Sequence, residues 1–192
     1  MGRNYRAHAR ELGNEPPAEP LLFWKPPSSL LRPGGTVELP PTDVSARVDQ
    51  EAEIALVIGR RARHVAPADA LAHVFGVTLA FDITARDLQK KNDQWTRAKG
   101  MDGFCPVGPL VVAGLDPQSL TFSCPVRGAT RQQGDARDMI FSPAELVAYA
   151  SRFFTLEPGD LLLTGTPEGV APLEPGDDLE LECGQIGVLR AS

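Results

Sequence analysis

Residues Val48 to Gly59 read VDQEAEIALVIG, an acidic cluster that runs directly into a strongly apolar segment. The apolar part, Ile54–Gly59, has the length and the β-branched content of a buried strand. If the strand begins by Glu51, the side chains of Glu51 and Glu53 point to the same face, because side chains alternate along a strand. Two carboxylates on one buried face repel each other unless a positive charge lies between them. A bound divalent cation is one interpretation of this stretch.

A third acidic residue, Asp82, follows the apolar run Val77–Phe81, where a second strand is predicted to end. Three carboxylates supply oxygen ligands and leave half of an octahedral shell for water and substrate, which favours Mg²⁺ or Mn²⁺ over zinc. The pattern alone allows a second interpretation of equal weight. In that one, Glu51 and Glu53 lie on a solvated edge and Asp82 caps a helix that begins at Thr84.

Turn signals are spread along the whole chain, with 18 prolines and 18 glycines between short apolar runs. Three Pro-Gly pairs predict type II turns, because proline fixes φ at the second turn position and glycine accepts a positive φ at the third. Each pair precedes a predicted strand, and these pairs and strands are Pro33-Gly34 with Thr36–Leu39, Pro158-Gly159 with Leu161–Leu163, and Pro175-Gly176 with Leu179–Leu181. Further strands are predicted at Val74–Asp82, Gly108–Ala113 and Leu120–Val126. The chain therefore reads as mainly β with few helices, an α+β fold.

Helical signals are few, and the clearest begins at Ser142. Pro143 stands at the first helical position and Glu145 three residues after the cap, which predicts a helix to about Phe154. Three shorter helices are predicted at Asn4–Leu12, Pro67–His73 and Thr84–Lys91. A polar, proline-containing connection, Gly13–Pro20, follows the first of them and suits a lid beside a rigid scaffold. We expect a lid helix and connection over residues 1–20 and a single β domain over 21–192.

Composition excludes several classes of protein. With 42% hydrophobic and 23% charged residues, the 192-residue chain has the composition of an ordinary globular protein. A net charge of -6 gives no basic surface for nucleic acid. Three cysteines without a C-x-x-C pair exclude a zinc ribbon or a disulfide scaffold. No segment approaches the ~20 apolar residues of a membrane span, and the N-terminus lacks the apolar core of a signal peptide, so we expect a cytoplasmic protein.

Polar side chains that could act on a substrate stand in two pairs. Arg86 and Gln89 stand three residues apart on a predicted helix just after Asp82, so both could face one site. His8 and Glu11 have the same spacing, at which a carboxylate can orient an imidazole as a general base. Taken alone, His8 and Glu11 are equally compatible with an exposed ion pair, and an isolated arginine such as Arg86 is more often a surface residue.

Six segments, in order, resemble the fumarylacetoacetate hydrolase family. They are Asn4–Glu11 (N-Y-x-x-H-x-x-E), Phe23–Ser29 (F-x-K-P-x-S), Asp49–Gly59 (E-x-E-L-x-x-V-I-G), Phe81–Gln89 (N-D-x-[ST]-A-R-D-x-Q), Trp95–Asp102 (W-x-x-x-K-x-x-D) and Pro158–Gly169 (P-G-D-x-x-x-T-G-T-P-x-G). Together they cover nearly the whole chain, and six motifs in a fixed order are far more specific than any one of them.

The resemblance implies a mixed β-sheet roll, a homodimer, and a Mg²⁺ or Mn²⁺ ion held by Glu51, Glu53 and Asp82. It also implies acid–base chemistry by His8 and Glu11, and it assigns further residues to the substrate and to its developing negative charge. These residues are Lys25, Arg86, Gln89, Lys99 and Thr166.

The resemblance implies an enzyme acting on small 2-oxo acids. We expect metal-dependent hydrolysis or decarboxylation of a C–C bond in acylpyruvates or oxaloacetate through an enolate. In one alternative, an enzyme with the same site isomerises or decarboxylates hydroxymuconate-type dienoates of aromatic catabolism. The alternative from another class is a β module without activity, in which the carboxylates hold a structural Ca²⁺ ion.

Overall fold

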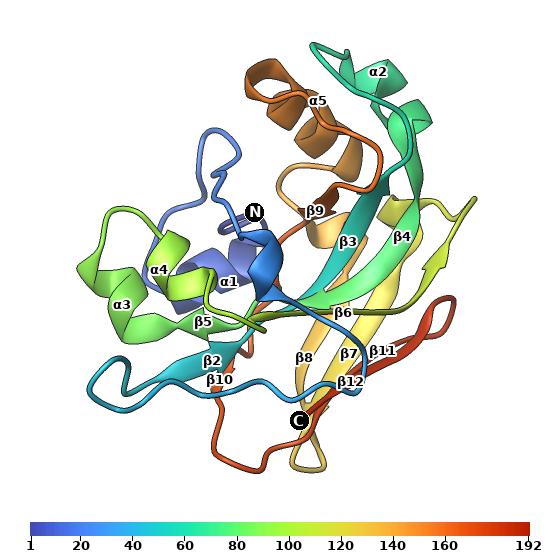
Figure 1. Ribbon diagram of the computed structural model, residues 1–192. Helices are drawn as coiled ribbons and strands as arrows, with labels where there is room; N and C mark the ends of the chain where they lie inside the picture. Colours follow the sequence, from blue (N-terminus) through green and yellow to red (C-terminus); the bar gives the residue numbers. More distant parts are fainter.

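The computed structural model describes residues 1–192 and consists of three small sheets that curl around one core, with the helices at the periphery (Figure 1). The largest sheet has the strand order β1-β6-β4-β3-β9. Its strands are β1 (Leu30–Leu31), β3 (Ala52–Ile58), β4 (Val74–Phe81), β6 (Cys105–Val112) and β9 (Leu161–Leu163). All its pairings are antiparallel except the parallel contact of β1 with β6, so the sheet is mixed, as predicted.

Two smaller antiparallel sheets complete the β structure. One has the order β10-β2-β5, with strands β2 (Val48–Gln50), β5 (Thr84–Ala85) and β10 (Ala171–Pro172). The other has the order β12-β11-β7-β8, with strands β7 (Thr121–Val126), β8 (Ala129–Asp135), β11 (Leu179–Cys183) and β12 (Gly187–Ala191). A single buried cluster of 34 residues takes side chains from all three sheets, which makes them one folding unit.

Five α-helices lie around the sheets. They are α1 (Arg6–Glu11), α2 (Pro67–Ala70), α3 (Arg86–Lys91), α4 (Thr96–Lys99) and α5 (Pro143–Phe153). Helix α5 has the predicted capping box, since the Ser142 hydroxyl accepts from the Glu145 N–H and the Glu145 carboxylate accepts from the Ser142 N–H. No helix is long and apolar enough to cross a membrane.

Strand β3 lies inside the largest sheet, between β4 and β9. Six of its seven residues are buried, as its continuous apolar sequence predicts. The predicted Pro-Gly turns are also confirmed, because Gly34, Gly159 and Gly176 all have positive φ angles. The two ends of β3 and β4 that carry the acidic residues therefore lie next to each other, with Ala52 paired to Phe81.

One predicted strand is wrong, and one predicted helix is confirmed except for its first two residues. Thr36–Leu39 is not a strand, because its backbone meets only the end of the chain, through the bond from the Val37 N–H to the Ser192 carbonyl (2.6 Å). The predicted helix Thr84–Lys91 begins two residues later, at Arg86. Thr84 and Ala85 form β5 instead, pairing with β2, so tertiary pairing overrides the local helical signal.

Candidate metal centre and active site

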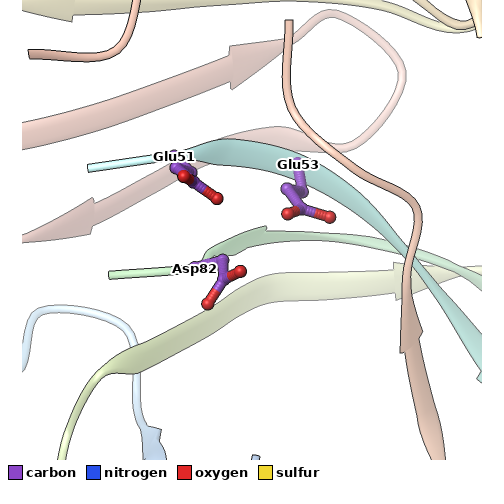
Figure 2. Close-up of side chains that lie close together, drawn as sticks. All are labelled: Glu51, Glu53 and Asp82. Atoms are coloured by element: carbon purple, nitrogen blue, oxygen red, sulfur yellow. The ribbon is translucent and has the colours of Figure 1, made fainter. Parts of the chain in front are cut away.

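Three buried carboxylates meet where strand β3 begins and strand β4 ends. Glu51 occupies the break between β2 and β3, Glu53 lies on β3, and Asp82 directly follows β4. One oxygen from each lies within 4.8 Å of the others. Figure 2 shows the three side chains pointing into a common space between the strands. The residues that the sequence singled out as a cluster are thus brought together, away from any solvated edge.

Two lysines balance part of this negative charge. The Nζ atom of Lys99 donates to Glu51 Oε2 (2.8 Å) and to Asp82 Oδ2 (2.5 Å). It also donates to the Thr84 hydroxyl (2.8 Å). Lys25 Nζ donates to the other Asp82 oxygen (2.8 Å). Burial opposes the charged form of Lys99, but Asp82 and Glu51 raise its pKa above the ordinary value, so the ammonium stays charged.

Arg86 makes a second buried ion-pair network beside the cluster. Its guanidinium donates to Asp49 Oδ2 (2.8 Å), to Glu51 Oε1 (2.7 Å) and to Gln89 Oε1 (2.6 Å). The predicted neighbourhood of Arg86 and Gln89 is therefore present. Burial acts to raise the pKa of Glu51, yet Lys99 and Arg86 hold it below its ordinary range, so this carboxylate is ionised.

Glu53 is the carboxylate of the cluster that forms no salt bridge, unlike Glu51 and Asp82. Its Oε2 atom accepts a hydrogen bond from the Gly165 N–H, and its buried Oε1 atom has no partner. Burial raises the pKa of Glu53 to about 8 against the opposing charge of the N-terminal ammonium, and the neighbouring carboxylates Asp82 and Glu51 add to the rise.

A buried acceptor without a partner, inside a cluster made only of carboxylate oxygens, fits a hard divalent cation. Glu51, Glu53 and Asp82 would hold the ion. Because no His or Cys joins the cluster, the donor set does not suit zinc.

The predicted acid–base pair is also in place. His8 and Glu11 lie on α1, with 3.1 Å between His8 Nδ1 and Glu11 Oε2. The second carboxylate oxygen, Glu11 Oε1, accepts from the Gly169 N–H (2.9 Å), which fixes the carboxylate from the opposite side. Helix α1 is anchored next to the cluster by Asn4, whose Nδ2 donates to the Thr164 carbonyl (2.8 Å).

A cavity of about 530 Å³ joins these parts. Five of the predicted site residues line it: His8, Glu51, Arg86, Gln89 and Lys99. Glu53 and Asp82 lie deeper, behind the lining. The cluster thus reaches the cavity through Glu51, which places its carboxylate oxygens beside the imidazole of His8 and the cations of Arg86 and Lys99.

Two predicted substrate contacts lie away from the cavity wall. The Thr166 hydroxyl donates to the Ala52 carbonyl (2.9 Å) and accepts from Gln132 Nε2 (2.7 Å), so its proton is already committed. Lys25 is bound to Asp82, and its ammonium also donates to the Lys99 carbonyl. Their contact with substrate stays a prediction.

Several residues with a part in the site were not singled out from the sequence. Asp49 stood inside the acidic cluster, but its ion-pair partner Arg86 lies 37 positions away, so no spacing in the sequence indicated the pair. Arg3 and Trp95 line the cavity, with the Arg3 guanidinium 5.9 Å from the Trp95 ring centroid. No spacing rule links residues 92 positions apart, so only the fold brings these two together.

Comparisons with known proteins agree with this geometry. The family model for the C-terminal part of fumarylacetoacetate (FAA) hydrolase matches residues 1–192. The chain is 45% identical to the mitochondrial oxaloacetate tautomerase FAHD1 of Arabidopsis thaliana, over 93% of this chain and 82% of that protein.

Two solved structures have nearly the same fold. A 5-carboxymethyl-2-hydroxymuconate delta-isomerase from Mycobacterium smegmatis is 41% identical with a TM-score of 0.91, covering 99% of this chain and 75% of that one. A fumarylpyruvate hydrolase from Pseudomonas aeruginosa, solved with Mn²⁺ and pyruvate, is 36% identical with a TM-score of 0.90, covering 99% and 85%. A match along the whole chain, with relatives at this identity and coverage, means that the protein belongs to the fumarylacetoacetate hydrolase family of enzymes.

Proposed function

We propose that the protein is a Mg²⁺- or Mn²⁺-dependent enzyme that cleaves a C–C bond in small 2-oxo acids, by hydrolysis or decarboxylation, through an enolate. Acylpyruvates and oxaloacetate are the substrates we expect. The observation that carries the proposal is the opening of the carboxylate cluster, through Glu51, onto a cavity that His8, Arg86 and Lys99 also line.

The charge of the cavity supports an anionic substrate. Although the chain has a net charge of -6, the cavity lining includes the cations Arg3, Arg86, Lys90 and Lys99. Arg3 and Lys90 have no carboxylate within ion-pairing distance, so they are available to a substrate carboxylate.

A divalent cation bound by Glu51, Glu53 and Asp82 would supply Lewis acidity toward the 2-oxo acid. The chain itself supplies fixed positive charge. Lys99 and Arg86 are held rigidly by their ion pairs, so they stabilise negative charge that develops on the substrate without having to reorganise.

His8 is the acid–base group of the proposal. Glu11 accepts from His8 Nδ1–H, which leaves Nε2 as the proton acceptor for a water that attacks the distal carbonyl. Decarboxylation needs no such water, so a change at His8 should affect hydrolysis more than decarboxylation. Replacing His8 with alanine should lower hydrolysis by roughly 10²–10⁴-fold. Full hydrolase activity of His8→Ala would contradict the assignment.

A second candidate is the tautomerisation or isomerisation of an enolisable oxo acid. It is favoured by the similarity of the chain to an oxaloacetate tautomerase and to a hydroxymuconate isomerase. The same cations would stabilise the same enolate, and His8 would then move a proton on or off carbon instead of activating water.

The test is to incubate metal-free protein with oxaloacetate, acetylpyruvate or a hydroxymuconate-type dienoate, with and without Mg²⁺ or Mn²⁺. Metal-dependent release of pyruvate would support C–C cleavage. A change in substrate absorbance without pyruvate would favour the second candidate. No turnover with any metal would contradict both and favour a structural ion site.

We also propose that the protein is a homodimer. Phe75, at the start of β4, and the pair Leu110 and Val111, near the end of β6, are large exposed apolar side chains on adjacent strands. Such a surface is typical of an interface. Light scattering after size-exclusion chromatography tests this, and a monomer at micromolar concentration would contradict it.

A further inference from the structure

The loop Thr164–Gly169 after β9 contacts both halves of the site. At its start, the Gly165 N–H donates to Glu53 Oε2 in the carboxylate cluster. At its end, the Gly169 N–H donates to Glu11 Oε1, the carboxylate that orients His8 (2.9 Å). The path of these six residues therefore sets the distance between the carboxylate cluster and the acid–base pair.

The loop follows the five-stranded sheet, and one side chain from the four-stranded sheet holds its middle. Gln132, on β8 of the four-stranded sheet, is fully buried. Its Nε2 atom donates to the Thr166 hydroxyl (2.7 Å) and to the Pro167 carbonyl (2.9 Å). Its Oε1 atom accepts from the Ala52 N–H (3.0 Å), directly between Glu51 and Glu53.

These bonds use both donors of the amide and one of its acceptor positions. The residue must donate to the loop and accept from β3 at once, and an amide does both while a carboxylate or an apolar side chain does not. Gln132 thus clamps the loop to the strand that carries the metal-binding glutamates.

The loop also packs against β8 through its backbone. Gly169 has a φ of +93°, and a Cβ atom placed there would lie 1.9 Å from the carbonyl oxygen of Arg131. No side chain fits at this position, so the loop end is pressed onto the residue that precedes Gln132. Two independent contacts, one by a side chain and one by backbone, therefore fix the loop on β8.

We propose that Gln132 is a positioning residue of the active site, which sets the Thr164–Gly169 loop and through it the placement of Glu53 and Glu11. The inference rests on the proposed function for its kinetic consequences. Its consequence for metal binding can be measured without any substrate.

The experiment compares Gln132→Met, which keeps the size of the side chain and removes all three hydrogen bonds, with Gln133→Met. Gln133 is the exposed neighbour on the same strand, so it is a matched control. Mn²⁺ affinity is measured by calorimetry, and kcat and KM are measured on the best substrate. Residues that support metal ligands change affinity or activity by about 10–100-fold. We expect that loss in Mn²⁺ affinity and in kcat for Gln132→Met, with KM changed less than about 3-fold, and no change for Gln133→Met.

A double-mutant cycle with Thr166→Val separates positioning from general destabilisation. If Gln132 acts through the loop, the losses of Mn²⁺ affinity in the two single variants should not add up in the double variant, because both changes break the bond between Gln132 and Thr166. Effects that multiply would overturn the proposal, as would a folded Gln132→Met with wild-type Mn²⁺ affinity and kcat.

Failure of the proposed function and failure of the inference about Gln132 give different results. If the wild type turns over none of the substrates, the proposed function fails and the Mn²⁺ measurement alone decides on Gln132. If Gln132→Met does not fold, Gln132→Glu replaces it, since the carboxylate still accepts from the Ala52 N–H but cannot donate to the loop. The same losses are then expected, and their absence would contradict the proposal.

Discussion

Two regions of the molecule place their ion pairs differently. One is the carboxylate cluster at the ends of β2, β3 and β4, and the other is the four-stranded sheet β12-β11-β7-β8. Around the carboxylate cluster, the ion pairs are buried, and Lys99 is only 1% exposed. On the four-stranded sheet the buried side holds no ion pair and the ion pairs lie outside, as in the pair of Arg190 with Glu180, whose arginine side chain is 62% exposed.

Burying charge is costly, and apolar residues of similar size would serve stability as well or better. The four-stranded sheet follows that rule. The cluster departs from it, and it does so where a cavity and an acid–base pair adjoin. This difference is what the proposed function requires, in which the buried charges serve binding and chemistry and the outer sheet supplies rigid support.

The largest effect on stability should come from removing the central cation. Lys99→Met leaves Glu51 and Asp82 without their shared ammonium, and breaking a buried pair on one side costs about 3–5 kcal/mol. Urea unfolding of the metal-free protein measures this loss. The control is Lys90→Met, an exposed lysine at the cavity that forms no ion pair. Equal, small losses in both variants would remove the distinction between the two regions.

The second effect concerns the metal. Mn²⁺ at 100 times its Kd should raise the free energy of unfolding by about 2.7 kcal/mol, because only the folded cluster binds it. Glu53→Gln should abolish this gain and leave the metal-free protein about as stable, since Glu53, unlike Glu51 and Asp82, has no salt bridge to lose. The control is Glu180→Gln, on the exposed sheet. Stabilisation by Mn²⁺ that survives Glu53→Gln would place the ion elsewhere.

Local signals pointed to part of this site but left a solvated edge equally open, and the order of the six family motifs is what favoured the site. The alternation of Glu51 and Glu53 before an apolar strand, and the i, i+3 spacing of His8 and Glu11, depend only on neighbouring residues. The helix at Ser142 could be predicted for the same reason, because its capping box lies within four residues.

The rest depends on contacts between distant segments. Strand β8 was not predicted, since its sequence ATRQQGD is polar and only its pairing with β7 makes it a strand. The role of Gln132 was invisible for the same reason, because its partners Ala52 and Thr166 lie far away in the chain. Thr36–Leu39 failed in the opposite direction, having a strand-like sequence but no strand to pair with.

A smaller effect on stability is expected at the N-terminus of helix α5, which belongs to neither of the two regions. Ser142→Ala removes the N-cap of α5 and should cost about 1 kcal/mol. The bonds from Ser142 lower the pKa of Glu145, so this carboxylate stabilises the folded state above the ordinary glutamate range and loses that effect as the pH falls through it. Unfolding at pH 7 and pH 3 should therefore show a larger cost of Ser142→Ala at pH 7. An equal cost at both pH values would contradict the part assigned to Glu145.

The smallest effect should come from the exposed ion pair itself. A double-mutant cycle on Arg190 and Glu180, whose nitrogen and oxygen lie 2.6 Å apart, should give a coupling of at most about 1 kcal/mol. Because both side chains reach solvent, 1 M salt should remove that coupling, whereas the loss caused by Lys99→Met should persist, since mobile ions do not enter the buried cluster. Salt thus separates two ion pairs of similar length by where they lie. A salt-sensitive Lys99→Met penalty would mean that the cluster is open to solvent, and the distinction between the two regions would fail at its strongest point.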